Sequence, residues 1–472
     1  MKKLLLTILS STVLFGLASC ENVAFGKNSS SSNYISSNDI SSISDNVSNS
    51  STNNIKVDGY LLKAAKPRYE VDYHIYTGEE YKSFSDKVKD FSANLTSKIY
   101  NSLDKSVQQN DCISPVSIYM ALAMAAECAD NNTRQELLDA LGLTYEEIST
   151  YTTYLYSLLN REFTSEDDNF QKIVVGEEIL KNSIWVDELV ELKETGLNSL
   201  ADKYHTDSYH VPFFTDNKLA NNLLRKYVYD NTKGLIDSDF KLGVETLFAL
   251  VNTFYLKDIW SSFGDELQYA KGNYDFVNND GSITNTQLLQ GYYYEGQLYE
   301  EESFSHFYTQ TQGGFKLKFI VPKDNYTLDD VFTYENINKV NNMRNYNAID
   351  DINMVQHNTR VIFPEFEASF DEDIARVLKE DFNINDLFDI DSCDMSNVTD
   401  ADLYCASVIH QTKLKVDKVG IEGAAVTIVQ MAGESGPIYE NVFHDFVIDR
   451  AFGFVLTDNF NIPLFSGVVE VI

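Results

Sequence analysis

The sequence lacks the short motifs that mark common classes of enzyme. It contains no H-E-x-x-H pair for zinc, no Walker loop and no dinucleotide fingerprint. Ser435 lies in "GESGP", which is not the G-x-S-x-G turn that presents a nucleophilic serine. Carboxylate runs such as "YEEESF" are typical of a solvated face in a chain this acidic. We therefore expect a protein that is not an enzyme and needs no cofactor.

Basic residues are also scarce. The chain has 37 Lys and Arg against 71 Asp and Glu, which gives a formal net charge of −34. We find no cluster of Lys or Arg along the sequence, and phosphate contacts require a basic patch. The composition argues against nucleic-acid binding and favours solubility or attraction of a basic partner.

Cysteine is rare, with 5 residues in 472 and no C-x-x-C pair. Besides Cys20, the chain has Cys112, Cys128, Cys393 and Cys405 at wide spacings that do not suggest a metal site. A disulfide is compatible with an exported protein, but the sequence leaves its pairing open. We expect Cys112 and Cys128 to be buried thiols because their neighbours are apolar.

The N-terminus has the order of parts of a secretory signal. Two lysines precede an apolar run that is too short for a membrane span, and small residues follow. Residues 17–20, "LASC", resemble the bacterial lipobox, so we expect residues 1–19 to be cleaved and Cys20 to carry a lipid anchor. The alternative is an ordinary signal peptide with a coincidental cysteine. Residues 20–83, rich in Ser and Asn at their start, are expected to be a tether and connector that holds the domain at the cell envelope or cell surface. The sequence leaves open which face of the membrane carries the anchor.

The remaining residues, 84–472, read as one large mixed domain. Apolar residues at helical spacing predict helices over 84–103, 113–129 and 131–141, the last of them ending at Gly142. Apolar, β-branched runs over 181–192 and 246–260 predict buried strands, with helices between them. From Asn278 onward short strands alternate with turns, and 452–472 predicts a β-hairpin. Helices first and sheets later indicate an α+β fold.

Several strings occur in an order typical of one family. They are "ISPVSIYMALAMAAECADNNTRQELLDALGL", "NSIWVDELVELK", "YVYDNTKGLI", "LVNTFYLKDIW", "FIVPKD", "IHQTKLKVDKVGIEGAAVT" and "PLFSGVV". In these strings the chain resembles the serpins, a family of serine protease inhibitors. The resemblance implies helices packed on three β-sheets and an exposed reactive-centre loop that a protease attacks. The cut loop then inserts into the largest sheet as an added strand.

The hinge of that loop is implied at Gly420, Ile421 and Glu422, followed by small and β-branched residues: Gly423, Ala424, Ala425, Val426 and Thr427. Small side chains suit passage between two strands, and β-branched ones suit a strand. Ile421 stands where the family usually has Thr or Ser, and Gly423 where it usually has Ala. The family's spacing of about fourteen residues from Gly420 implies Glu434-Ser435 as the reactive bond, with Met431, Ala432 and Gly433 as alternatives.

The resemblance also implies a polar cluster under the sheet where its strands part. Buried hydroxyl, amide and imidazole groups need mutual hydrogen bonds, so such a cluster can hold the sheet closed. Trp260 matches a tryptophan under the place where the loop enters. Thr232 and Gly234 match the helix that shields the sheet, while Arg225 stands where the family usually has Asn. The implied cluster comprises Ser114, Pro115, Ser117, Asn252 and His410, with Trp260 beside it.

We therefore predict a monomeric, exported and lipid-anchored inhibitor that acts as a suicide substrate of a protease, which we expect to be a serine protease. The alternative is a non-inhibitory serpin that serves as a binding protein at the cell surface.

Overall fold

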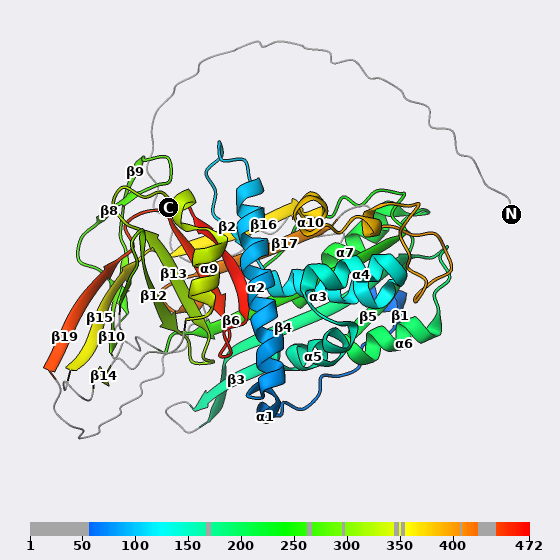
Figure 1. Cartoon of the computed structure of the whole chain (residues 1–472), viewed down its shortest axis with the longest axis horizontal. Coiled ribbons are helices and arrows are strands. Elements are labelled where there is room, and N and C mark those ends of the chain that lie inside the picture. Colours follow the sequence, from blue (N-terminus) through cyan, green and yellow to red (C-terminus); the bar gives the residue numbers. More distant parts are fainter. Residues whose placement is uncertain are drawn as a thin grey trace, which may run out of the picture. The chain divides into compact units, whose positions relative to one another are not determined.

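The computed structural model describes residues 56–166, 171–261, 267–294, 298–343, 349–350, 355–405, 408–422 and 440–472 (Figure 1). Within these ranges the chain forms helices on several β-sheets, as the sequence predicts for an α+β fold.

The predicted N-terminal helices are confirmed. α2 (Glu79–Ser102) buries the apolar stripe that contains Phe84 and Leu95. α3 (Pro115–Cys128) is buried on nearly all sides and starts at Ser114, whose Oγ accepts the Ser117 N–H. α4 (Asn131–Leu141) ends at Gly142, which has the left-handed φ of 64° that favours glycine. The other helices are α1 (Tyr73–Tyr76), α5 (Tyr145–Leu158), α6 (Glu194–Lys203), α7 (Asn217–Asn231), α8 (Leu328–Val331), α9 (Tyr334–Asn341) and α10 (Ala375–Phe382).

The main sheet has eight strands and contains both strands predicted in the middle of the chain. Its central pair is β4 (Lys172–Asp187) and β6 (Phe248–Ile259), which run antiparallel. The strand order is β1-β5-β4-β6-β18-β17-β16, and β3 also pairs with β4. The remaining strands are β1 (Leu61–Lys63), β3 (Asn160–Glu166), β5 (Thr206–Val211), β16 (Phe366–Asp373), β17 (Ile409–Val416) and β18 (Gly420–Ile421).

Two further sheets are built from the C-terminal half, together with β2. The second sheet has the order β14-β15-β10-β7, with β19 parallel to β15. The third has the order β11-β12-β13-β20-β21-β2 and includes the predicted terminal hairpin β20–β21. A separate hairpin joins β8 to β9. The bounds are β2 (Asp111–Ile113), β7 (Gln268–Tyr269), β8 (Tyr274–Val277), β9 (Ile283–Thr286), β10 (Leu289–Tyr294), β11 (Tyr299–Glu300), β12 (Phe304–Gln310), β13 (Lys316–Pro322), β14 (Ile349–Asp350), β15 (Val355–Phe363), β19 (Glu440–Val447), β20 (Phe452–Thr457) and β21 (Pro463–Val469).

The two faces of the main sheet pack against different elements. α3 contacts both β6 and β21, and the stacked rings of Phe254 and Phe465, 5.4 Å apart, join the same two strands. On the opposite face, α7 packs over the sheet through Tyr227 and Val228, which meet Trp185 in a second apolar cluster. Side chains alternate between faces along a strand, so β6 contributes to both cores.

The connector before α2 contributes to the folded unit. The short helical turn η1 (Val57–Tyr60) leads into β1, which pairs antiparallel with β5 at the edge of the main sheet. Cys112 and Cys128 are fully buried free thiols, as predicted, because both lie among apolar side chains. No helix within the described ranges combines the length and apolarity required to cross a membrane.

Candidate functional site

Two long strands of the main sheet, β6 and β17, are separated by the short strand β18 and are not paired with each other among the described residues. β6 pairs with β4 over its length, and β17 pairs with β16 from Ile409 to Val416. Between β6 and β17 lies only the two-residue strand β18. Within the described residues, the facing edges of 248–257 and 409–415 therefore carry no strand-to-strand ladder. This unpaired gap is the candidate site, and Figure 1 shows β6 and β17 running through the middle of the molecule.

Gly420 fits against β6 because it has no side chain. A Cβ there would come within 2.0 Å of the Asp258 carbonyl oxygen and 2.8 Å of the Ile259 Cα. The chain reaches this position through a tight turn in which Asp417 N–H donates to the Gly420 oxygen at 3.0 Å. Trp260 fixes the turn, since its Nε1 donates to the Asp417 oxygen at 2.9 Å. Glycine at position 420 is thus required by a close backbone approach.

The strand β18 ends where Glu422 turns away from the sheet. Ile421 is fully buried, whereas Glu422 has a left-handed φ of 62°, uncommon for a residue with a side chain. Its N–H still donates to the Lys415 oxygen at 2.7 Å. Burial raises the pKa of the Glu422 carboxyl, while its hydrogen bond with Tyr255 acts in the opposite direction. The chain can continue as a strand only if Glu422 changes to an extended conformation.

Asp258 supports the same junction from β6. Its carboxylate is fully buried and accepts the Ile259 N–H at 2.9 Å and the Gly313 N–H at 2.6 Å. Burial raises its pKa to about 6, against the pull of these hydrogen bonds. Nearby, Val419 packs against an apolar cluster formed by Val175 of β4 and Ile259 of β6. The hinge is therefore held by both polar and apolar contacts.

Part of the predicted polar cluster is joined by hydrogen bonds under the gap. The Ser114 N–H donates to His410 Nε2 at 3.0 Å, and the Ser114 Oγ donates to the Leu464 oxygen at 2.8 Å. Ser117 is linked through its N–H to the Ser114 Oγ, with Pro115 at the first turn of the helix between them. Burial lowers the pKa of His410 to about 3, so its imidazole is neutral at pH 7.

Asn252 takes a different partner. Its Nδ2 donates to the Asn182 Oδ1 of β4 at 2.5 Å, and Asn182 Nδ2 donates to the Tyr204 oxygen at 2.6 Å. The Asn252 Oδ1, Thr253 Oγ1 and Gln411 Oε1 are buried without a hydrogen-bond partner among the described residues. Buried polar atoms of this kind usually have partners, so three at one place indicate an unfilled position.

These unpartnered atoms belong to residues that line a cavity of about 50 Å³ between β6 and β17. Val228 of α7 and Phe240 and Leu242 beyond it complete the lining. α7 ends at Asn231 and is capped by Thr232, whose Oγ1 donates to the Val228 oxygen, and Gly234 follows with a φ of 83°. α7 therefore covers the gap, as the resemblance implies for the shielding helix.

Trp260 lies at the hinge turn, where it bonds Asp417. Arg225 on α7 forms ion pairs with Asp237 and Asp239 at 2.7 and 2.5 Å. The other predicted site residues lie outside the described residues, so the structure says nothing of them: Cys20, Gly423, Ala424, Ala425, Val426, Thr427, Glu434 and Ser435.

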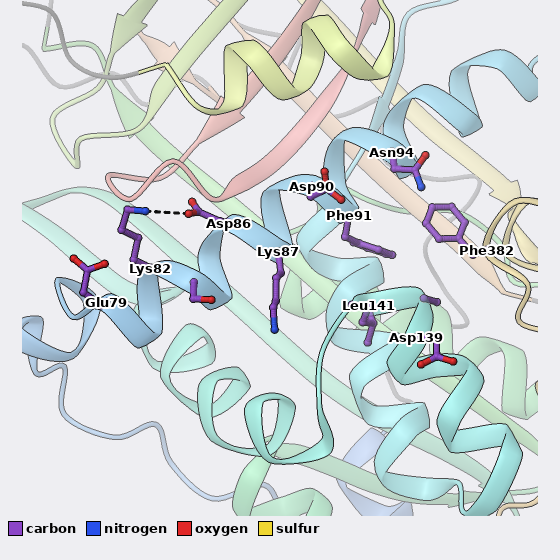
Figure 2. A pocket seen from close by; sticks show the side chains of 13 residues that line it. Glu79, Lys82, Asp86, Lys87, Asp90, Phe91, Asn94, Asp139, Leu141 and Phe382 are labelled. Atoms are coloured by element: carbon purple, nitrogen blue, oxygen red, sulfur yellow. Dashed lines mark hydrogen bonds and ion pairs between the residues drawn. The ribbon is translucent and has the colours of Figure 1, made fainter.

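Two open pockets elsewhere carry mixed charge. Figure 2 shows one of about 590 Å³ between α2 and α4, where Lys82 pairs with Asp86 at 3.1 Å. Another, of about 780 Å³, gathers basic side chains from separate segments, which the sequence did not show as a cluster. Carboxylates lie among these basic side chains, so the pocket carries charges of both signs. Its basic residues are Lys66, Arg68, Arg161, Lys172, Lys181 and Lys233, and its acidic ones are Glu162, Glu177, Glu178 and Asp207.

Comparison with known families accounts for this arrangement of strands. The family model described as Serpin (serine protease inhibitor) matches residues 88–471. The chain belongs to the serpin family. The predicted family and α+β serpin fold are thereby confirmed. Iripin-1 of Ixodes ricinus is 25% identical over 394 residues, which cover 79% of this chain and 92% of Iripin-1.

Solved serpin structures share the fold. The thermophilic serpin tengpin in its native state has a TM-score of 0.65 at 23% identity and covers 88% of this chain and 98% of its own. Thyroxine-binding globulin in complex with thyroxine has a TM-score of 0.64 at 20% identity, and the match covers 82% of this chain and 99% of the globulin chain. The serpin fold therefore occurs in a thyroxine-binding protein, although the family is described by serine protease inhibition, and the fold does not by itself specify a mechanism.

Several residues of the site were missed by the sequence reading. Asn182 and Asp258 are polar residues inside apolar strand runs, and that placement was the available signal, whereas Gln411 lies among other polar residues of β17 and gave none. The left-handed φ of Glu422 could not be predicted from the sequence, because Glu rarely adopts this conformation and no neighbouring residue marks the exception.

Proposed function

We propose that this serpin inhibits a protease as a suicide substrate, by inserting its cut loop between β6 and β17. The observation that carries the proposal is that Gly420 and Ile421 already occupy this position as β18, while among the described residues no strand pairs with the facing edges of 248–257 and 409–415. The hinge is thus the first part of a strand that the sheet can extend.

The register of β18 predicts where the loop would go. Ile421 pairs with β6 at Asp258 and also with β17. Carried along both strands, this register would bring Thr427 between Asn252 of β6 and His410 of β17. The unpartnered Asn252 Oδ1 would then be within reach of a threonine hydroxyl.

The alternation of side chains fits the same register. Ile421 faces the buried side, so Gly423, Ala425 and Thr427 would face it as well. These side chains are small, as a strand entering a packed interior requires. Insertion would pair both backbone groups of about ten loop residues and form roughly 20 hydrogen bonds with β6 and β17.

Inhibition would involve a covalent bond between the protease and the loop residue on the N-terminal side of the cut. A protease nucleophile would attack the carbonyl of the bait residue and form an ester, while the new amine leaves with a proton. Insertion then draws the esterified end down the sheet before water can release it. We place the reactive bond at Glu434-Ser435, with Met431 to Gly433 as the alternatives in register, which implies a serine protease that accepts an acidic side chain.

We also propose that Cys20 anchors the domain outside the cytoplasm as a lipoprotein, and that the inhibitor works as a monomer. Radiolabelled palmitate should enter the wild type and not a Cys20→Ser variant, which should leave the membrane fraction. Labelling of Cys20→Ser, or no labelling of the wild type, would overturn the anchor.

The inhibitor proposal is tested by mixing the protein with a panel of serine proteases that includes a Glu-specific enzyme. We expect an SDS-stable complex with at least one protease, and mass spectrometry of the released fragment should locate the cut between Met431 and Ser435. Cleavage without a complex across the panel would contradict the proposal and favour the alternative, a non-inhibitory binding protein at the cell surface.

A further inference from the structure

Two histidines on neighbouring strands of the second sheet face one another. β19 runs parallel to β15, with His357 opposite Val442 and His444 opposite Thr359, so the two histidines are diagonal neighbours. His357 Nδ1 and His444 Nε2 are joined by a hydrogen bond of 2.9 Å, so one of these nitrogens carries a proton that a metal ion would displace. The rings are inclined by only 23°, with centroids 5.2 Å apart. Figure 1 shows β15 and β19 side by side at the edge of the molecule.

The separation of these nitrogens suits two ligands on one metal ion. With metal–nitrogen bonds of about 2.0–2.1 Å and angles between about 90° and 110°, two imidazole nitrogens lie roughly 2.9–3.4 Å apart. Imidazole is a preferred ligand of Zn²⁺, Ni²⁺ and Cu²⁺. Both side chains are partly exposed, so an ion could reach them and keep water at its other positions.

Other charged groups near the pair are occupied. Arg360 and Asp445, from the same two strands, form a bidentate ion pair at 2.6 and 2.9 Å. Glu300 of β11, which acts electrostatically on His444, pairs with Lys323 at 2.7 Å. Among the described residues no group of three or more His, Cys, Asp or Glu side chains is arranged to hold a metal. The pair would thus be a two-ligand site open to solvent.

We propose that His357 and His444 chelate one divalent transition metal ion and thereby link β19 to β15.

The position of β19 gives this link a consequence, which rests on the proposed function. β19 begins at Glu440, directly after the loop residues 423–439. An uncut loop inserted as far as Phe248 would descend about 33 Å along β6, at roughly 3.3 Å per residue. The residues from 432 to 439 join residue 431 to Glu440 through nine Cα-to-Cα steps that reach at most about 32 Å, so they could not return from there to a β19 that stays in place. Full insertion of an uncut loop therefore requires β19 to leave β15, and the metal would oppose it.

Binding itself is tested without reference to inhibition, by calorimetric titration of the intact protein with Zn²⁺ and Ni²⁺, and with Mg²⁺ as a control cation. We expect one site in the wild type, loss of that site in His357→Gln and in His444→Gln, and an unchanged site in His74→Ala. His74 is an exposed histidine on α1 and serves as the matched control. No binding by the wild type, or binding retained by both Gln variants, would overturn the site.

A second measurement needs no variant and so does not depend on their folding. Hydrogen exchange of the wild type should slow with Zn²⁺ in peptides covering β15 and β19, and not in those covering α2. Slowing elsewhere only, or nowhere, would overturn the assignment to this pair.

The link to the loop is tested by storing the uncut protein at elevated temperature and following the loss of a protease-sensitive loop. At a free metal concentration of 100 times the Kd, a metal that binds only the paired state should slow this loss by up to about 100-fold. If the metal binds but the rate of loss of the protease-sensitive loop is unchanged, the coupling between metal and loop is overturned, whereas the metal site itself is still supported. Failure of the protease panel would affect neither the titration nor the exchange measurement.

Discussion

Gly420 lies against Asp258 so closely that a Cβ on the glycine would be 2.0 Å from the aspartate's carbonyl oxygen. This contact seats the first residues of the loop between β6 and β17. A Gly420→Ala change should push β18 away from β6 and destabilise the intact protein by about 1–3 kcal/mol, as overpacking does. Chemical denaturation measures the stability, and complex formation with the target protease should fall. Gly59→Ala, with open space around its Cβ, is the matched control and should change neither. Equal effects of both substitutions would contradict this role of Gly420.

Glu422 sets the balance between the turned-out and the inserted loop. Its left-handed φ of 62° costs a β-branched residue roughly 1–2 kcal/mol more than it costs glycine. Glu422→Val should therefore shift the balance toward insertion and Glu422→Gly away from it, with the two variants differing by roughly five- to thirtyfold. The rate at which uncut protein loses its protease-sensitive loop measures both. A common direction for the two variants would refute this reading of the hinge.

Thr427 is predicted to meet Asn252 and His410 only after cleavage. Thr427→Val keeps the shape and removes the hydroxyl, so the cut protein should lose about 1 kcal/mol while the uncut protein stays unchanged. Guanidinium unfolding of both forms measures the difference. Thr427→Ser, which keeps the hydroxyl, should behave closer to the wild type, and a loss in the uncut form alone would place Thr427 elsewhere.

His410 makes the stability depend on pH. Its pKa is about 3 in the folded protein and about 6.5 when unfolded, so the unfolded state binds the additional proton between these values. The free energy of unfolding should therefore decrease as pH falls below 6.5, by up to about 1.4 kcal/mol per unit, until about pH 3. Compared with His410→Gln, the wild type should lose about 2 kcal/mol more between pH 7 and pH 5. Urea unfolding at both pH values tests this, and parallel curves for the two proteins would contradict it.

The sequence was sufficient for features that depend on local pattern. The cap at Ser114, the stop at Gly142 and the runs that became β4 and β6 follow from periodicity and from residue preferences near helix ends. The hinge role of Gly420 was implied by the resemblance to a family and stays a prediction, while the structure shows a close contact that requires glycine there.

Features that depend on distant segments could not be predicted in this way. The Asn252–Asn182 bond joins residues 70 positions apart, and the edge strand β1 pairs with β5 because of the fold as a whole. The basic side chains around Lys181 come from separate segments, so a search along the sequence finds no cluster. Glu422 adopts its left-handed φ directly after the end of β18, and the position of that end depends on contacts with distant strands.

The central claim is that β6 and β17 accept the cut loop as a strand between them. Hydrogen exchange should be compared for the intact protein and for protein cut within 423–439, followed in peptides covering 248–257 and 409–415. The account predicts that both edges exchange in the intact protein and become strongly protected after cleavage. Unchanged exchange at both edges after cleavage would contradict it.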